Sequence, residues 1–370
     1  MKTRIILITL TTALLLSAYF VFAVGTSFQD VLDTPAATNA HAAKQMLVGV
    51  TLAGKRMVSV GLHGHIVYSD DQGKNWTQAA VPVSCDLLAV HFPTPKDGWV
   101  VGHDGVVLHS ADAGATWSKQ FDGRAAAQVM EVHYFNKESC SGCHAAPELP
   151  PVKGPTSAES ACLMAEVKKF TNQGPDKPFL DVWFENEKTG FVVGAFSLIY
   201  RTDDGGKSWV PWYDRIDNTR HFHLNAIRKI GEDIFIASEQ GTLFKLDQKK
   251  GRFTAIKTPY TGTLFGITGK PGALVAFGMR GNAFLSRDGG TNWQKIETGV
   301  ESGVTGTVVT EEGKIILTSQ GGNVLVSSDD GASFTKVKID QPTPTNAVAA
   351  FDKNTLALVG QRGVTVQSIK

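Results

Sequence analysis

A short motif that recurs five times along the chain constrains its fold more than any other feature. The motif reads Ser/Thr-x-Asp-x-Gly-x-Asn/Thr/Ser and is followed by an aromatic residue. Trp76 and Trp117, which end the first two copies, lie 41 residues apart, and so do Trp293 and Phe334, which end the last two. A period of about 40 residues is typical of β-propeller blades or solenoid units. The five copies begin at Ser69, Ser110, Thr202, Ser286 and Ser327.

The chemistry of this Asp box is that of a tight turn. Its Asp and Ser/Thr side chains can accept backbone N–H bonds, its Gly can adopt a positive φ, and its aromatic residue can bury against a sheet. A degenerate copy between Lys245 and Phe253 fills the gap after Trp209. Three alternating strands precede each box, so one unit has four strands. Counting units by their third strands predicts an all-β, seven-bladed β-propeller, with these strands starting near Ile66, Val106, Leu198, Thr242, Ala283, Val324 and Val364.

The seventh unit has no box and no fourth strand of its own. Residues Phe28 to Pro35 resemble the fourth strand that starts at Phe253. We expect this N-terminal segment to supply the missing strand and close the ring, because an open array would leave an exposed sheet edge. The propeller would then span residues 26–370.

The first 25 residues predict export. Lys2 and Arg4 precede a stretch from Ile5 to Gln29 without a charged side chain, which is typical of a signal peptide; the stretch is also long enough for a membrane anchor. The protein is therefore expected in the periplasm or otherwise exported, and a retained segment would anchor it to the inner membrane. Lys+Arg number 36 and Asp+Glu 35, without long runs of one sign, which argues against nucleic acid as a partner. We expect a monomer.

An insertion of about 51 residues follows the second box, within residues 122–176. Residues 123–138 predict one helix, and a capping box at Thr156 predicts the start of a second. We expect this helical hairpin to be an exposed appendage that the propeller does not need in order to fold. No metal site is assigned.

The linker of this hairpin contains Cys140-Ser-Gly-Cys143-His144. This is the attachment pattern of covalent haem c, with Met164 as the candidate second axial ligand. The interpretation we favour is that Cys140 and Cys143 form structural disulfides with Cys85 and Cys162; haem attachment is the first alternative and a Cys/His metal site is the second. The propeller itself requires no cofactor.

Partner docking is expected on the face that carries the turns between second and third strands. Variable loops gather there, and they can change without disturbing the blades. The connector after Trp209 adds a dense polar and aromatic cluster typical of interface anchors, although a purely structural, salt-bridged connector is the alternative. The candidate docking residues are His63, His103, Asp104, Glu239, Arg280 and Arg362 on the turns, and Trp212, Arg215, Asp217, Arg220, His221 and His223 in the connector.

The Asp boxes and the blade motif from Gly98 to Gly105 resemble the BNR-repeat propellers of the photosystem II stability/assembly factor family, over residues 28–370. The resemblance implies a non-enzymatic, exported assembly platform that binds a membrane-protein partner. The helical insertion departs from the family pattern. An accessory protein of an envelope transporter is one alternative. A glycan-binding or sialidase-like hydrolase is another, but no arginine triad or nucleophile pair is evident, so no catalytic residue is assigned.

Overall fold

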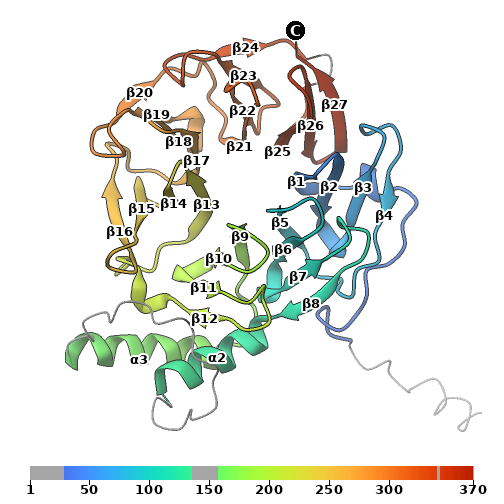
Figure 1. Cartoon of the computed structure of the whole chain (residues 1–370). Helices are drawn as coiled ribbons and strands as arrows, with labels where there is room; N and C mark the ends of the chain where they lie inside the picture. Colours follow the sequence, from blue (N-terminus) through green and yellow to red (C-terminus); the bar gives the residue numbers. More distant parts are fainter. Residues whose placement is uncertain (1–28, 136–156, 340–341, 370) are drawn as a thin grey trace, which may run out of the picture.

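A computed structural model of the chain describes residues 29–135, 157–339 and 342–369. Its seven sheets stand around a ring as propeller blades, each built from strands consecutive in sequence (Figure 1). Among the described residues, no helix is long and apolar enough to span a membrane.

The first six blades have four strands each and the last has three. Blade one comprises β1 (Leu47–Ala53), β2 (Arg56–Gly61), β3 (Ile66–Ser69) and β4 (Thr77–Gln78); blade two β5 (Leu87–His91), β6 (Gly98–Gly102), β7 (Val107–Ser110) and β8 (Ser118–Phe121); blade three β9 (Phe179–Phe184), β10 (Gly190–Gly194), β11 (Ile199–Thr202) and β12 (Val210–Pro211); blade four β13 (Leu224–Ile230), β14 (Asp233–Ser238), β15 (Thr242–Asp247) and β16 (Arg252–Lys257); blade five β17 (Leu264–Lys270), β18 (Ala273–Gly278), β19 (Ala283–Ser286) and β20 (Gln294–Ile296); blade six β21 (Val304–Val309), β22 (Ile315–Ser319), β23 (Val324–Ser327) and β24 (Thr335–Val337); and blade seven β25 (Thr345–Ala350), β26 (Thr355–Gly360) and β27 (Gly363–Ser368). The predicted third strands are confirmed to within one residue.

The Asp boxes are closed hydrogen-bonded turns between third and fourth strands. In blade one, Ser69 Oγ accepts the Gly73 N–H at 2.8 Å, and Asp71 Oδ1 accepts the Asn75 N–H at 2.8 Å. Trp76 Nε1 donates to the Gly73 carbonyl at 3.1 Å. The N–H groups at Asn75 lower the pKa of Asp71 to about 2. The boxes define the box face of the ring, and the turns between second and third strands define the opposite tip face.

The predicted closing strand is wrong. Residues 31–34 form a turn, in which the Asp30 carboxylate accepts the Leu32 N–H at 2.9 Å and the Asp30 carbonyl accepts the Thr34 hydroxyl. Local side-chain hydrogen bonds of this kind compete with strand pairing. Leu32 is buried in the core shared by blades one and two, on the far side of β1 from blade seven. The ring closes instead by packing of β25 and β26 against β1.

The insertion is part of the core and not an appendage, which corrects the expectation. Its helices are α2 (Gly123–Phe135) and α3 (Ser157–Asn172), at the periphery of blades two and three (Figure 1). Ala126, Met130 and Val167 are each 1% exposed and share one cluster with Phe179 and Tyr200 of blade three. The Tyr200 hydroxyl donates to the Ala126 carbonyl at 2.9 Å. Buried apolar side chains three or four residues apart on each helix explain why the hairpin packs against blade three instead of projecting into solvent.

Cys85 is a free, buried thiol in the core of blades one and two, and burial raises its pKa to about 12. The predicted disulfide between the insertion and Cys85 is therefore wrong, because Cys85 packs in the core of blades one and two and its thiol is free. Cys140, Cys143 and His144 lie outside the described residues. Disulfides among Cys140, Cys143 and Cys162, haem attachment and a Cys/His metal site all stay predictions.

Candidate functional site

Five of the turns on the tip face, those of blades one to five, share one backbone geometry. Their third residue adopts a left-handed conformation, with φ between 50° and 57° at His63, Asp104, Phe196, Gln240 and Arg280. The fourth residue is usually glycine because the next connector passes close by. A Cβ on Gly64, for example, would collide with the Val83 carbonyl oxygen.

Blade three departs from this pattern at both positions. Phe196 holds a φ of 53° and is 53% exposed, and Ser197 follows it with a φ of 69°. A bulky side chain in the left-handed region is a conformational outlier, and such strain concentrates at functional sites. Ser197 is held there by the connector, since its N–H donates to the Phe222 carbonyl and its hydroxyl accepts from Asn218 Nδ2 at 3.0 Å.

A groove of about 420 Å³ opens beside Phe196, between the helical hairpin and the tips of blades three and four. We call it the hairpin groove. The helical side contributes apolar and charged residues from α2, α3 and the segment after α3, and the propeller side contributes the tip of blade three and the connector. Its lining residues are Met130, Glu166, Lys169, Phe170, Gln173, Lys177, Phe196, Tyr213, Arg220, His221, His223 and Glu239.

Aromatic and imidazole rings form the propeller wall of the groove. Tyr213 and His221 stack with centroids 5.6 Å apart, and the Tyr213 hydroxyl lies 2.7 Å from His221 Nδ1. His223 meets the Phe196 ring edge-on at 4.7 Å, and its backbone N–H donates to Glu239 Oε2 at 3.2 Å. These contacts fix the orientation of the two imidazoles relative to the exposed Phe196 ring.

The charges of the groove are mixed, with cations on both walls. Lys177 Nζ lies 5.0 Å from the centre of the Phe170 ring and 3.4 Å from Asp176. The Arg220 guanidinium donates to Gln240 Oε1 at 2.6 Å and lies over the Phe222 ring. Within the described ranges, no carboxylate is within ion-pair distance of Arg220, so this cation can bind an acidic group of a partner.

The structure brings four of the predicted docking residues together in the hairpin groove: Arg220, His221, His223 and Glu239. Trp212 is not a docking anchor. It is 1% exposed and belongs to the core of blades three and four, because its ring packs edge-on against Phe191 at 5.1 Å. The aromatic side chain at this position of the connector packs in the core and does not form part of a docking surface.

Arg215 and Asp217 lie away from the groove, along the outer edge of blade four. Arg215 stacks on the Trp212 ring, and Asp217 pairs with Arg252 Nη2 at 2.6 Å. The connector also bridges to β16 at Phe253. These two residues connect blade three to blade four, as expected for a purely structural connector. The remaining predicted residues lie on four other turns of the tip face: His63, His103 with Asp104, Arg280 and Arg362.

A second departure from the repeat lies between the first strands of blades three and four. Where β1 and β13 carry Gly49 and Ala226 next to a bulge, β9 carries Asp181. Its buried carboxylate accepts the Ile227 N–H at 2.8 Å and pairs with the Arg228 guanidinium. Burial raises the pKa of Asp181, while Arg228 opposes the shift. The buried Asp181 carboxylate thus joins β9 to β13 and fixes the register between blades three and four.

The helical half of the groove was absent from the sequence-based prediction. Lys169, Phe170 and Lys177 reach the site only because the hairpin folds back onto blade three; in sequence, all three residues lie more than 30 positions before the connector. Phe196 carried a visible signal: alignment of the turns shows an aromatic residue followed by Ser where other turns end in Gly.

A family model described as photosynthesis system II assembly factor YCF48 matches residues 68–141 and 166–295, which is more than half of the chain. The chain belongs to the Ycf48 family. The photosystem II assembly lipoprotein Ycf48 of Synechococcus sp. (strain CC9902) is 28% identical over 144 residues, which cover 38% of this chain and 43% of that protein. The photosystem II assembly protein Ycf48 of Synechococcus sp. (strain JA-2-3B'a(2-13)) is 24% identical over 180 residues, covering 48% and 51%. The chain thus spans about half the length of the curated relatives it matches.

Solved Ycf48 structures confirm the seven-bladed fold. A structure described as YCF48 bound to D1 peptide superposes with a TM-score of 0.61 at 15% identity, covering 88% of this chain and 94% of the other. YCF48 from Cyanidioschyzon merolae gives a TM-score of 0.61 at 13% identity, covering 91% and 98%. At these identities the likeness establishes the Ycf48 architecture of this chain.

Proposed function

We propose that this Ycf48-family protein is an exported, non-enzymatic platform that holds a segment of a membrane-protein partner in the hairpin groove. The observation that carries the proposal is Phe196. Its backbone has a left-handed conformation and its ring is half-exposed at the mouth of the groove. Arg220 also lines this groove and has no carboxylate partner among the described residues. Exposed aromatic and arginine side chains together are typical of interface anchors.

Three observations support the choice of partner class. A structure of a Ycf48 relative is described as bound to a D1 peptide, so a propeller of this family accommodates a polypeptide segment. A curated relative is named a lipoprotein, which agrees with an envelope location. The groove mixes aromatic, cationic and anionic groups, as a peptide site requires, and Arg220 favours an acidic residue in the bound segment.

Site-specific photocrosslinking tests the proposal. A photoreactive phenylalanine analogue placed at Phe196 is expected to crosslink to one membrane protein in intact cells of the native host. The same analogue at Lys74, which is exposed on the box face, serves as the matched position away from the groove. Mass spectrometry of the adduct identifies the partner and the segment in contact.

A charge variant gives the second arm of the test. Arg220→Ala should reduce the Phe196 crosslink severalfold, whereas Arg280→Ala, on the turn of blade five, should leave it unchanged. Equal crosslinking from Phe196 and Lys74, or equal loss from both arginine variants, would contradict a site in the hairpin groove. A crosslink to a soluble protein or glycan conjugate would contradict the membrane-protein partner.

A further inference from the structure

The outer edge of blade seven is open. β27 pairs with β26 on one side, and blade seven has three strands where each other blade has four. Ile369 donates its N–H to the Asn354 carbonyl, and hydrogen-bonded pairs alternate along an antiparallel ladder, so Val364 and Val366 direct their N–H and C=O groups outwards. Within the described part of the chain, these outward groups have no backbone partner.

The surface beside this edge repeats a packing site that is filled elsewhere in the ring. Where a blade has an Asp box, the box packs on the preceding blade: Gly114 of blade two lies against Val58 of blade one, and Gly331 of blade six lies against Val275 of blade five. Blade seven has no box. The corresponding position on blade six is therefore uncovered.

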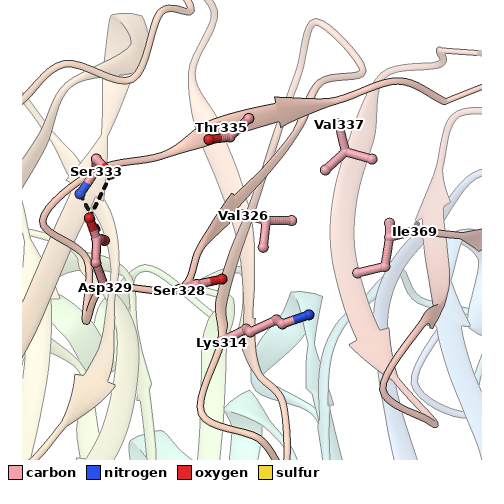
Figure 2. A pocket seen from close by; sticks show the side chains of 8 residues that line it. All are labelled: Lys314, Val326, Ser328, Asp329, Ser333, Thr335, Val337 and Ile369. Atoms are coloured by element: carbon pink, nitrogen blue, oxygen red, sulfur yellow. Dashed lines mark hydrogen bonds between the residues drawn. The ribbon is translucent and has the colours of Figure 1, made fainter.

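A groove of about 410 Å³ marks this uncovered position (Figure 2). Val326 and Val337 of blade six line one side, and Ile369, directly after β27, lines the other. Figure 2 shows these three apolar side chains around one opening, with Thr335 above and Lys314 below. The groove has an apolar floor and a polar rim. Every second side chain of an added strand would point into the groove and contact its apolar floor.

We propose that the edge of β27 and this groove bind an extended, acidic segment of a partner protein, which adds to blade seven as its fourth strand. Six blades of the same ring show that the geometry accepts such a strand. Backbone hydrogen bonds to Val364 and Val366 hold the segment, and its alternate side chains contact Val326 and Val337. This site is on the outside of the ring and is independent of the hairpin groove.

Charge complementarity selects the partner segment over other occupants. Asp329 in the groove wall is engaged within its own box, where Ser333 Oγ donates to it at 2.6 Å. Among the described residues, no carboxylate is within ion-pair distance of Lys314, so this cation can pair with an acidic side chain of a bound segment. A second copy would present its own β27, which has no acidic residue, and residues 1–28 hold no Asp or Glu.

A labelled peptide of eight alternating Val and Thr residues, with Glu at its second position, is the probe. A strand antiparallel to β27 begins at the box face, which places this Glu near Lys314. Fluorescence anisotropy with the full chain should show binding at least tenfold tighter than for the same peptide with a central proline, which removes a ladder N–H. Replacing the peptide's Glu by Lys should weaken binding about fivefold, as expected for one exposed ion pair.

Matched variants locate the peptide. Lys314→Glu should reverse the preference so that the Lys peptide binds more tightly, while Lys336→Glu, on β24 but outside the groove lining, should not. Hydrogen exchange should be fast at Val364 and Val366 in the free protein and slow with the peptide. Equal binding of the proline peptide, or no response to Lys314→Glu, overturns the proposal.

Exchange in the free protein distinguishes the other occupants. Protected β27 amides together with a dimer in light scattering would assign the edge to a second copy. Protected amides in a monomer, lost when residues 1–28 are removed, would assign it to the protein's own N-terminal segment. Either result also overturns the proposal.

Discussion

Replacing Phe196 by Asn separates binding from stability, because two structural effects of the change nearly cancel. An ordinary side chain in the left-handed region costs about 1–2 kcal/mol, and Asn tolerates that region better, so relief of strain contributes about 1 kcal/mol. The ring is 53% exposed, so about half of the roughly 2–3 kcal/mol for full Phe burial is lost. The free energy of unfolding should therefore change by less than about 1 kcal/mol.

Thermal unfolding and partner capture should be measured on the same preparations. Unfolding entropy is about 2 cal/mol/K per residue, so for 370 residues a change of about 1 kcal/mol moves the Tm by only about 1–2 °C. Capture of the membrane partner should fall by at least about tenfold if Phe196 is an anchor.

Arg280→Asn is the matched control for this variant. It makes the same replacement at the third residue of the blade five turn, where φ is 55°, outside the hairpin groove. We expect it to leave capture unchanged. A Phe196→Asn variant that melts about 5 °C lower and still captures its partner would show that the ring is a packing residue, and the reasoning from strain to function would be refuted.

Four further predictions concern the propeller. Leu32→Ala should cost about 3 kcal/mol in chemical denaturation because the side chain is 1% exposed, and a cost below about 1 kcal/mol would contradict its role in the core. Tyr134→Phe removes the hydrogen bond at 2.7 Å to Asp214 and should cost about 1 kcal/mol, with faster hydrogen exchange in α2; unchanged exchange would show that the helix is held otherwise. The pKa of Asp71 is lowered to about 2 from 3.8 by the Asn75 N–H groups, so this box stabilises the fold above about pH 4 and the contribution is lost as pH falls towards 2, which Asp71→Asn should abolish in acid titrations followed by circular dichroism. Cys85, as the one cysteine left after Ser replaces the others, should react with a thiol reagent at pH 8 only on unfolding, because burial raises its pKa to about 12; rapid reaction of the folded protein would contradict this.

The repeat pattern was sufficient to predict the blades, because each Asp box is a local structure. The hydrogen bonds of the box that starts at Ser69 connect residues two to four apart, so the motif specifies the turn without help from the rest of the chain. The hairpin helices were predicted for the same reason. Their packing into blade three was not, because burial of Met130 depends on a surface formed by distant strands.

The predictions that proved wrong concern residue types that occur in two different structural settings. Residues 28–35 match the alternation of a fourth strand, but the Asp30 carboxylate bonds to the backbone two residues later and turns the chain. Trp212 has the composition of an interface anchor, and equally that of a core residue between Phe191 and Phe253. Which purpose applies is decided by contacts between blades, which spacing along the sequence does not encode.

Closure of the ring by packing, without a strand shared between the chain ends, has a consequence for the order of folding. Every sheet is complete once its own consecutive strands have been synthesised, so the blades can fold one after another as the chain emerges. The seam is different, since Asn346 Nδ2 reaches the Leu47 carbonyl across 299 residues of sequence. Until blade seven has been synthesised, the face of blade one that packs against it stays exposed to solvent. We expect the nascent protein to be most prone to aggregation during that interval.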